Sequence, residues 1–188
     1  MPGTNQDQNI QVSTHETPNP STMKFQFSHP VLAEPLEFRD VRDCHSSPLA
    51  MKLFGFPWVS EVFLGSDYMT VTKKDWVEWE MLAQPLTSLI QEHFDQGEPV
   101  VHQTEAEDES TNDLPVVREI KRCLREEIRP IVAMDGGDIR FVKYEDGVLS
   151  LRMMGACSGC PSSQQTLKDG IEVRIRELLP EVKEVVSV

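Results

Sequence analysis

The chain has 188 residues, of which 39% are hydrophobic and 26% are charged, and its formal net charge at pH 7 is −13. A chain of this length can bury one ample core or two small ones, and none of its apolar runs approaches the roughly 20 residues of a membrane-spanning helix. The acidic excess, without a basic stripe to engage phosphates, argues against nucleic acid as a partner, and the missing span argues against a membrane.

The negative charge is concentrated in the first part of the chain. Residues 1–112 carry 18 acidic and 6 basic side chains, which gives −12, whereas the rest carries 13 and 12, which gives −1. Residues 97–112 show no sustained hydrophobic period and are rich in acidic residues and turn formers. We therefore expect two small α+β domains, over residues 16–96 and 113–188, joined by a flexible acidic linker.

The N-terminal residues 1–22 are polar, with no basic side chain before Lys24 and no apolar stretch. They match neither a secretory signal nor an arginine-rich transit peptide. We expect residues 1–15 to be disordered.

The first domain should contain three strands and two helical segments. Alternating apolar residues predict strands over Met23–Ser28, Val59–Leu64 and Tyr68–Thr72. Ser47-Pro48 should begin a short helix, and a longer one should begin at Asp75, with a kink or a new start at Pro85.

The second domain should be a helix, a hairpin, a second helix and a final strand. The first helix has Asp113 as its expected N-cap and Pro130 near its end or at a kink. Its expected buried side chains are those of Val117, Ile120, Leu124, Ile128 and Ile131.

The hairpin should follow a tight turn at Asp135–Asp138. Its strands are expected over Ile139–Tyr144 and Val148–Met153, and Asp146-Gly147 is a strong signal for the turn that joins them. Leu149, Leu151 and Met153 should face one side of the sheet, and Ser150 and Arg152 the other. The second helix should begin at Pro161 and bury the side chains of Leu167, Ile171, Ile175 and Leu178, and the final strand should lie over Val182–Val188.

Cys157 and Cys160 form a CxxC pair between a predicted strand end and a predicted helix start. Small neighbouring residues leave backbone N–H groups free to bond to the sulfurs. The positive end of the helix dipole should favour the thiolate form. Nothing suggests secretion, so a disulfide framework is a poor explanation for the four cysteines of the chain.

Four interpretations of this pair compete. The cysteines could be incidental small hydrophobic residues, although the polar loop disfavours that. A redox pair is expected in a thioredoxin-like βαβ unit, whereas this pair follows a hairpin. A zinc site needs four ligands, and the chain has no second CxxC and no histidine after His102. An iron–sulfur cluster needs four thiolates, so another polypeptide would have to supply two of them.

Other reactive residues have simpler explanations. Cys123 should be a packed thiol, and Cys44, beside His45, should be a loop residue before the Ser47-Pro48 helix. The Asp135–Asp138 segment has too few oxygen ligands for a calcium loop. The three tryptophans, Trp58, Trp76 and Trp79, should be core residues. The spacing of the remaining histidines does not bring them together at one site; they are His15, His29, His93 and His102.

Three segments of the second domain carry a specific resemblance. Asp135–Asp138, Met154–Ser163 and Thr166–Ile171 resemble the C-terminal domain of the NifU-like (Nfu) family of iron–sulfur carriers, over roughly residues 113–188. Further segments resemble the Nfu N-terminal domain, namely Glu16–Pro20, Met23–Phe25, Ser47–Leu49, Val62–Gly65 and Thr70–Thr72. The resemblance covers nearly the whole chain.

The resemblance implies that Cys157 and Cys160 of two subunits hold one [4Fe-4S] cluster between them. It implies a homodimer when loaded, transfer of the cluster to apo iron–sulfur proteins, and contact with upstream cluster-assembly proteins. The protein would not be an enzyme, and its N-terminal domain would contact partners or support the conformation.

Two other functions use the same residues differently. The CxxC pair could serve a thiol-disulfide oxidoreductase, and the acidic first domain could make the protein a metal-free adaptor. The expected compartment is the bacterial cytosol, with a mature mitochondrial matrix form as the alternative.

Overall fold

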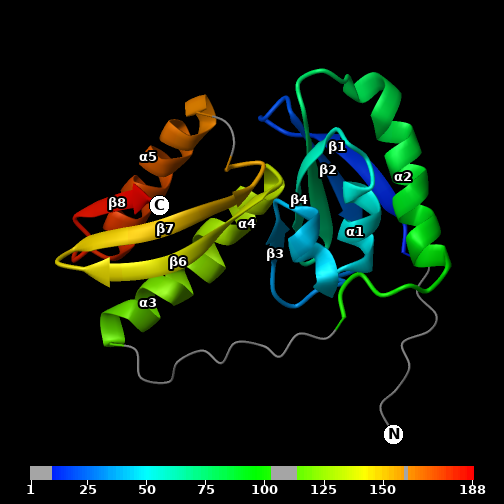
Figure 1. Ribbon diagram of the computed structural model, residues 1–188. Helices are drawn as coiled ribbons and strands as arrows, with labels where there is room; N and C mark the ends of the chain where they lie inside the picture. Colours follow the sequence, from blue (N-terminus) through cyan, green and yellow to red (C-terminus); the bar gives the residue numbers. More distant parts are fainter. Residues whose placement is uncertain (1–9, 103–113, 159–160) are drawn as a thin grey trace, which may run out of the picture. The chain divides into compact units, whose positions relative to one another are not determined.

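The computed structural model describes residues 10–102, 114–158 and 161–188, the last range with side chains from residue 168 (Figure 1). The chain divides into two compact units, whose main parts are residues 23–104 and 105–188. Each unit contains helices packed on a sheet of its own. The expectation of two α+β domains is therefore confirmed.

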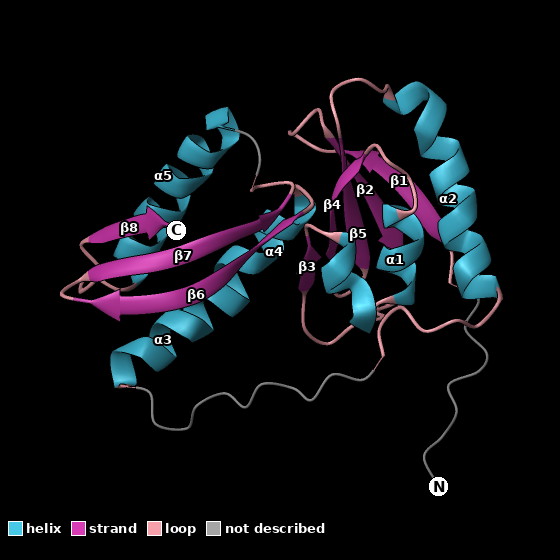
Figure 2. Cartoon of the chain, viewed as in Figure 1, coloured by secondary structure: helices cyan, strands magenta, loops and turns pink. Residues whose placement is uncertain are grey.

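The first domain contains a five-stranded sheet with strand order β1-β2-β5-β4-β3 (Figure 2). Strand β4 pairs antiparallel with both β3 and β5. The elements in chain order are β1 (Val12–Glu16), β2 (Thr22–Phe27), β3 (Leu36–Phe38), the 3₁₀ helix η1 (Val41–Ser46), α1 (Pro48–Phe54), β4 (Val59–Leu64), β5 (Tyr68–Lys73) and α2 (Trp79–Asp95). The three predicted strands and the short helix at Ser47-Pro48 are present.

Strand β1 overlaps the segment 1–15 that we expected to be disordered, and the prediction was wrong for residues 12–15. Its polar side chains give no hydrophobic alternation because it is an edge strand with exposed positions. Gln91 of α2 holds it, accepting a hydrogen bond from the Val12 N–H (3.1 Å) and donating one to the Ile10 carbonyl (2.7 Å). Such a contact leaves no periodic signal in the sequence.

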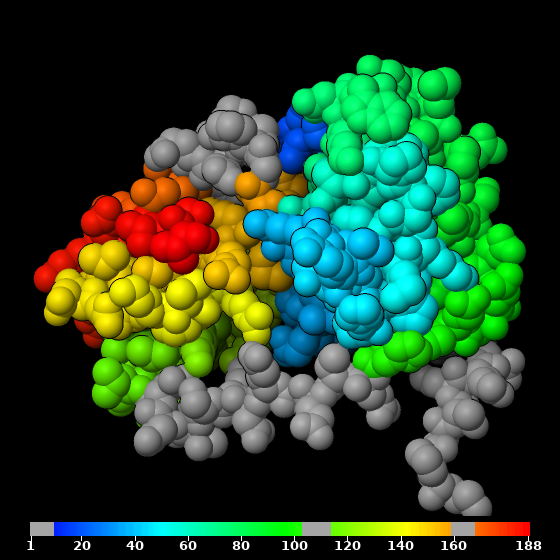
Figure 3. All heavy atoms as spheres, in the orientation of Figure 1, coloured from blue at the N-terminus to red at the C-terminus, as the bar shows by residue number. Residues whose placement is uncertain are grey.

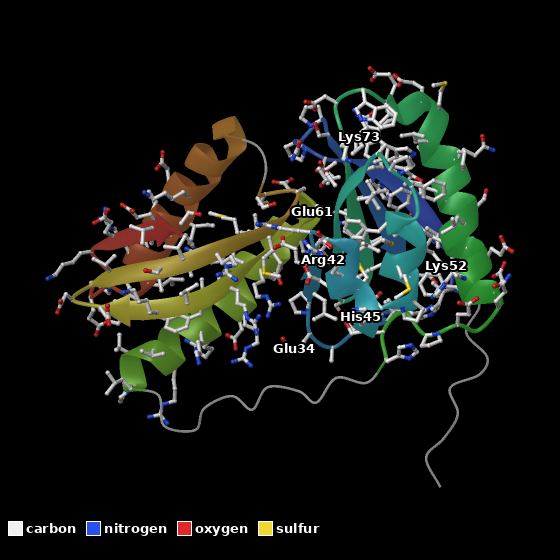
Figure 4. All side chains as sticks on the ribbon, viewed as in Figure 1. Glu34, Arg42, His45, Lys52, Glu61 and Lys73 are labelled. Carbon is white, nitrogen blue, oxygen red and sulfur yellow. The ribbon has the colours of Figure 1, made fainter. Side chains whose placement is uncertain are left out.

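Residues 97–102 belong to the first domain, so the linker does not begin at residue 97. Val100 is buried, and its carbonyl accepts a hydrogen bond of 2.7 Å from the Ser47 hydroxyl. Lys52 of α1, labelled in Figure 4, forms an ion pair with Glu98. The rest of the expected linker lies outside the described residues.

Helix α2 begins at Trp79 and not at Asp75 as we expected, so Trp76 lies outside the helix. Trp79 packs against the core and Trp58 is buried, but Trp76 precedes the helix and is 65% exposed. The prediction that Trp76 is a core residue was therefore wrong. Pro85 lies inside one continuous helix rather than at a new start.

The second domain contains a three-stranded sheet of order β6-β7-β8, with the helices packed against it (Figures 1 and 2). Strand β7 pairs antiparallel with β6 and parallel with β8, and Figure 3 shows the red β8 segment against the yellow hairpin. The elements are α3 (Pro115–Cys123), the π-helical η2 (Leu124–Ile128), α4 (Arg129–Met134), β6 (Gly137–Glu145), β7 (Val148–Gly155), α5 (Pro161–Leu178) and β8 (Glu184–Ser187).

The hairpin confirms the sequence prediction, and the final strand is present but shorter than predicted, over Glu184–Ser187 instead of Val182–Val188. Asp146 and Gly147 both have positive φ, 53° and 88°, as a two-residue turn matching the twist of the strands requires. Leu149, Leu151 and Met153 of β7 are buried in the core of this domain.

The first helical segment of this domain contains a π turn that changes which side chains are buried. The Arg129 N–H donates to the Leu124 carbonyl five residues earlier, just before Pro130, which has no N–H of its own. A π turn contains more residues than an α turn. The residues after it are therefore rotated about the helix axis relative to their positions in an uninterrupted α-helix. Val132 is therefore fully buried and Ile131 is 57% exposed, contrary to the prediction.

The ends of the helices differ from the prediction in two further places. Leu178 is 43% exposed, and Leu179, four residues after Ile175, is buried in its place. The expected N-cap Asp113 lies outside the described residues, and Pro115 occupies the first turn of α3. Within the described residues, no helix combines the length and the apolar composition that crossing a bilayer requires.

The rotation caused by the π turn can be tested with two alanine substitutions. Val132→Ala should lower the free energy of unfolding by about 1–3 kcal/mol, because it removes packed methyl groups from the core. Ile131→Ala, at an exposed neighbouring position, should change it by less than about 0.5 kcal/mol. Urea unfolding followed by circular dichroism measures both. A larger loss for Ile131→Ala would contradict the observed burial.

Candidate functional site

The loop that carries the first cysteine begins with a sharp turn at the end of β7. Gly155 has a φ of 63°, a conformation that glycine adopts at little cost. Its carbonyl accepts hydrogen bonds from the Ser158 N–H (3.0 Å) and the Ser158 hydroxyl (2.9 Å). These bonds close the turn around Cys157, so the position of Cys157 follows directly from the end of the strand.

The same loop is attached to the turn that precedes β6. The Ala156 N–H donates to the Gly136 carbonyl (3.1 Å), and Gly136 has a φ of 78°. Gly137 pairs with Gly155 in the antiparallel ladder. The expected turn at Asp135–Asp138 is therefore shorter than predicted, because Gly137 and Asp138 already belong to β6.

An ion pair fixes the start of β6 to the start of α4. The guanidinium of Arg129 donates to both carboxylate oxygens of Asp138, at 2.8 and 2.6 Å, and Asp138 is only 5% exposed. One of these oxygens also accepts a hydrogen bond from the Ile139 N–H (2.8 Å). Paired geometry of this kind is strong and directional. The carboxylate of Asp138 is thus engaged within the domain.

Cys157 is a buried, free thiol that packs in the core of the second domain. Burial raises the pKa of the Cys157 thiol to about 12, and the carboxylates of Asp135 and Asp138 act in the same direction. This is opposite to the effect that we expected from the helix dipole. The charged form of the thiol would lie in an apolar environment, which disfavours it.

A thiol in this environment keeps its proton at neutral pH, which has a chemical consequence. A nucleophilic or redox cysteine works as a thiolate and normally has a lowered pKa. A metal ligand, by contrast, loses its proton when it binds, because the positive charge of the metal replaces it. The buried thiol of Cys157 is therefore a poor redox nucleophile, and a metal ion that bound it would have to displace its proton.

Cys160, the second cysteine of the pair, lies outside the described residues, and its role as a ligand stays a prediction. Among the residues that the structure describes, no three His, Cys, Asp or Glu side chains gather at one metal-sized site.

The two other cysteines lie inside the two cores. Cys44 is fully buried in the 3₁₀ helix η1, where its thiol donates to the Asp40 carbonyl (3.4 Å), and burial raises its pKa to about 11. It is a core residue rather than the loop residue that we expected. Cys123 is buried in the second core, and burial raises its pKa as well.

Sequence reasoning missed the ion pair of Arg129 with Asp138 and the close packing of Gly137. The run of two glycines between two aspartates was a signal for a turn, but it could also have indicated a close approach of the backbone to another group. No local pattern connects Arg129 with Asp138, because the partners lie on different elements.

Two family models match this chain. The model described as NifU-like domain matches residues 120–186, and the model described as Scaffold protein Nfu/NifU N terminal matches residues 10–97. Each match covers most of one of the two domains.

Curated relatives match over nearly the whole chain. NFU1 iron-sulfur cluster scaffold homolog, mitochondrial, of Drosophila persimilis is 38% identical over 94% of this chain and 64% of its own length. NifU-like protein 5, mitochondrial, of Arabidopsis thaliana is 41% identical over 92% of this chain and 66% of its own length. NifU-like protein 4, mitochondrial, of the same plant is 39% identical over 92% and 64%.

This chain thus spans slightly less than two thirds of the length of these relatives. The two family models match the two domains in chain order, with the Nfu N-terminal model first and the NifU-like model second. The chain belongs to the NifU-like (Nfu) family and consists of an Nfu N-terminal domain followed by a NifU-like domain.

Proposed function

We propose that this protein is an iron–sulfur cluster carrier, in which Cys157 and Cys160 of two copies hold one [4Fe-4S] cluster between them. The observation that carries the proposal is the placement of Cys157 in a closed loop directly after the end of β7. The name of the Drosophila persimilis relative, which calls it an iron–sulfur cluster scaffold, supports it.

The count of ligands supports sharing of the cluster between two copies. A cluster of this class is normally held by four cysteine thiolates, and the CxxC pair supplies two. Of the two remaining cysteines, Cys44 is buried in the core of the first domain and Cys123 packs in the same core as Cys157. A second copy brings an identical pair, and a two-fold axis through the cluster would complete the set.

Transfer would proceed by exchange of ligands rather than by catalysis. A thiolate of the acceptor protein binds an iron atom, the iron–sulfur bond to Cys157 or Cys160 breaks, and the released cysteine takes up a proton. The high pKa of the buried Cys157 thiol favours that protonation. Repetition of this step moves the cluster to the acceptor, and no covalent intermediate with a substrate forms.

The remaining roles follow from the two domains and the relatives. The first domain, in the acidic part of the chain, would contact acceptor or cluster-assembly proteins, and the protein would have no enzymatic activity of its own. The relatives are named as mitochondrial proteins, which favours the mitochondrial matrix over the bacterial cytosol as the compartment.

Four single substitutions test which cysteines hold the cluster. Cys157→Ser and Cys160→Ser should each abolish bound iron and acid-labile sulfide after anaerobic reconstitution, because each removes one ligand from both halves of the site. Cys44→Ser and Cys123→Ser should retain the cluster and lose stability by about 1–3 kcal/mol, since a hydroxyl replaces a packed thiol. Iron and sulfide assays on all four proteins give the answer. Retention of the full cluster in Cys157→Ser would refute the assignment.

The carrier function and the shared cluster need a separate experiment. The reconstituted protein should have the native mass of a dimer and should activate an apo [4Fe-4S] enzyme faster than equal amounts of free iron and sulfide do. Cys157→Ser, treated in the same way, serves as the control. A colourless monomer after reconstitution would exclude the shared cluster. A redox protein would contain no acid-labile sulfide and would instead reduce a disulfide substrate.

A further inference from the structure

We propose that Gly137 is a positioning residue for Cys157. The side chain that Gly137 lacks would occupy the space of the Cys157 sulfur, so the backbone at the start of β6 determines where that sulfur lies. The contact itself is independent of the proposed function, whereas its consequence for cluster binding rests on it.

The distances at Gly137 leave no room for a side chain. A Cβ atom at this position would lie 2.3 Å from the sulfur of Cys157, 3.0 Å from the Cβ of Cys157 and 3.0 Å from the carbonyl oxygen of Met154. Contacts below 3.0 Å essentially never occur for real Cβ atoms, so any substitution must move one of the neighbours.

The backbone conformation does not explain the glycine. The described glycines with positive φ are Gly97, Gly136, Gly147 and Gly155, and Gly137 is not among them. An alanine would therefore be compatible with the backbone at Gly137, unlike at Gly136. The obstacles at Gly137 are the side chain of Cys157 and the carbonyl oxygen of Met154 in β7.

The backbone on both sides of the contact is held more firmly than the cysteine side chain. Gly137 and Asp138 pair with Gly155 and Met154 in the ladder, and the ion pair with Arg129 ties Asp138 to α4. A shift of β6 would break these bonds, whereas a shift of Cys157 mainly disturbs one short side chain. We therefore expect a side chain at position 137 to displace the sulfur rather than the strand.

Gly170 provides a matched control in the same domain. It lies in α5, and a Cβ atom there would meet no other heavy atom within 4 Å. Gly170→Ala makes the same chemical change as Gly137→Ala without a new contact. Because alanine favours helices more than glycine does, Gly170→Ala should leave the melting temperature unchanged or raise it.

The first experiment measures the contact in the cluster-free, full-length protein. Gly137→Ala, Cys157→Ala and the double variant are unfolded by heat and followed by circular dichroism. Fluorescence of Trp58, Trp76 and Trp79 reports on the first domain separately. Gly137→Ala should lower the melting temperature of the second domain by roughly 4–8 °C or more. The loss should be clearly smaller in the Cys157→Ala background, where the sulfur is missing.

Each outcome of these unfolding experiments shows whether the cost of Gly137→Ala comes from its contact with the Cys157 sulfur. Equal losses in both backgrounds would overturn the proposal, because the cost would then not involve the Cys157 sulfur. If Gly137→Ala alone does not fold, recovery of the fold in the double variant supports the contact, and failure of the double variant refutes it. The fluorescence transition of the first domain should be the same in all variants.

The second experiment measures the consequence for the cluster. After anaerobic reconstitution, Gly137→Ala should bind less iron and sulfide per chain than Gly170→Ala, which should match the unmodified protein. Full loading of a folded Gly137→Ala protein would overturn the positioning role. If the unmodified protein takes up no cluster, the proposed function fails, and the unfolding cycle still decides whether Gly137 positions Cys157.

Discussion

The close approach of two backbone segments, at the start of β6 and the end of β7, is the constraint on which the candidate site depends. Gly137 and Gly155 face each other in the ladder, and Cys157 emerges beside them with its sulfur against Gly137. The ion pair of Arg129 with Asp138 holds one segment to α4, and the hydrogen bond from Ala156 to Gly136 holds the other. Helix, strand and loop thus meet around a single thiol.

This arrangement explains why Cys157 does not have the lowered pKa that is expected for a cysteine at a helix start. The sequence placed Cys157 before a helix, where the dipole would favour a thiolate. The structure buries the thiol in the core of the second domain, and desolvation raises its pKa instead. Burial of a single side chain depends on contacts between distant segments, such as that of Gly137 with Cys157. Local spacing cannot provide this information.

Much of the fold could be predicted because it depends on local patterns. The hairpin followed from Asp146-Gly147, the core face of β7 from alternation, and the helix α1 from Ser47 and Pro48. The predictions were wrong where the structure of one segment depends on contacts with another segment. Strand β1 is held by a side chain of α2, and the π turn before Pro130 exchanges Ile131 for Val132 in the core. At the candidate site, the role of Cys157 as a ligand was predicted from its motif and stays a prediction, whereas the contacts of Gly137 and Arg129 became visible only in the tertiary structure.

The parallel pairing of β7 with β8 has a consequence for the synthesis of the protein. Because β7 lies in the middle of its sheet, it needs hydrogen-bonding partners on both edges, and the partner on one side comes from residues 184–187. A ribosome delivers the cysteine loop well before it delivers these residues. Until these residues are made, one edge of β7 lacks its partner, so the sheet that leads into the cysteine loop is completed last.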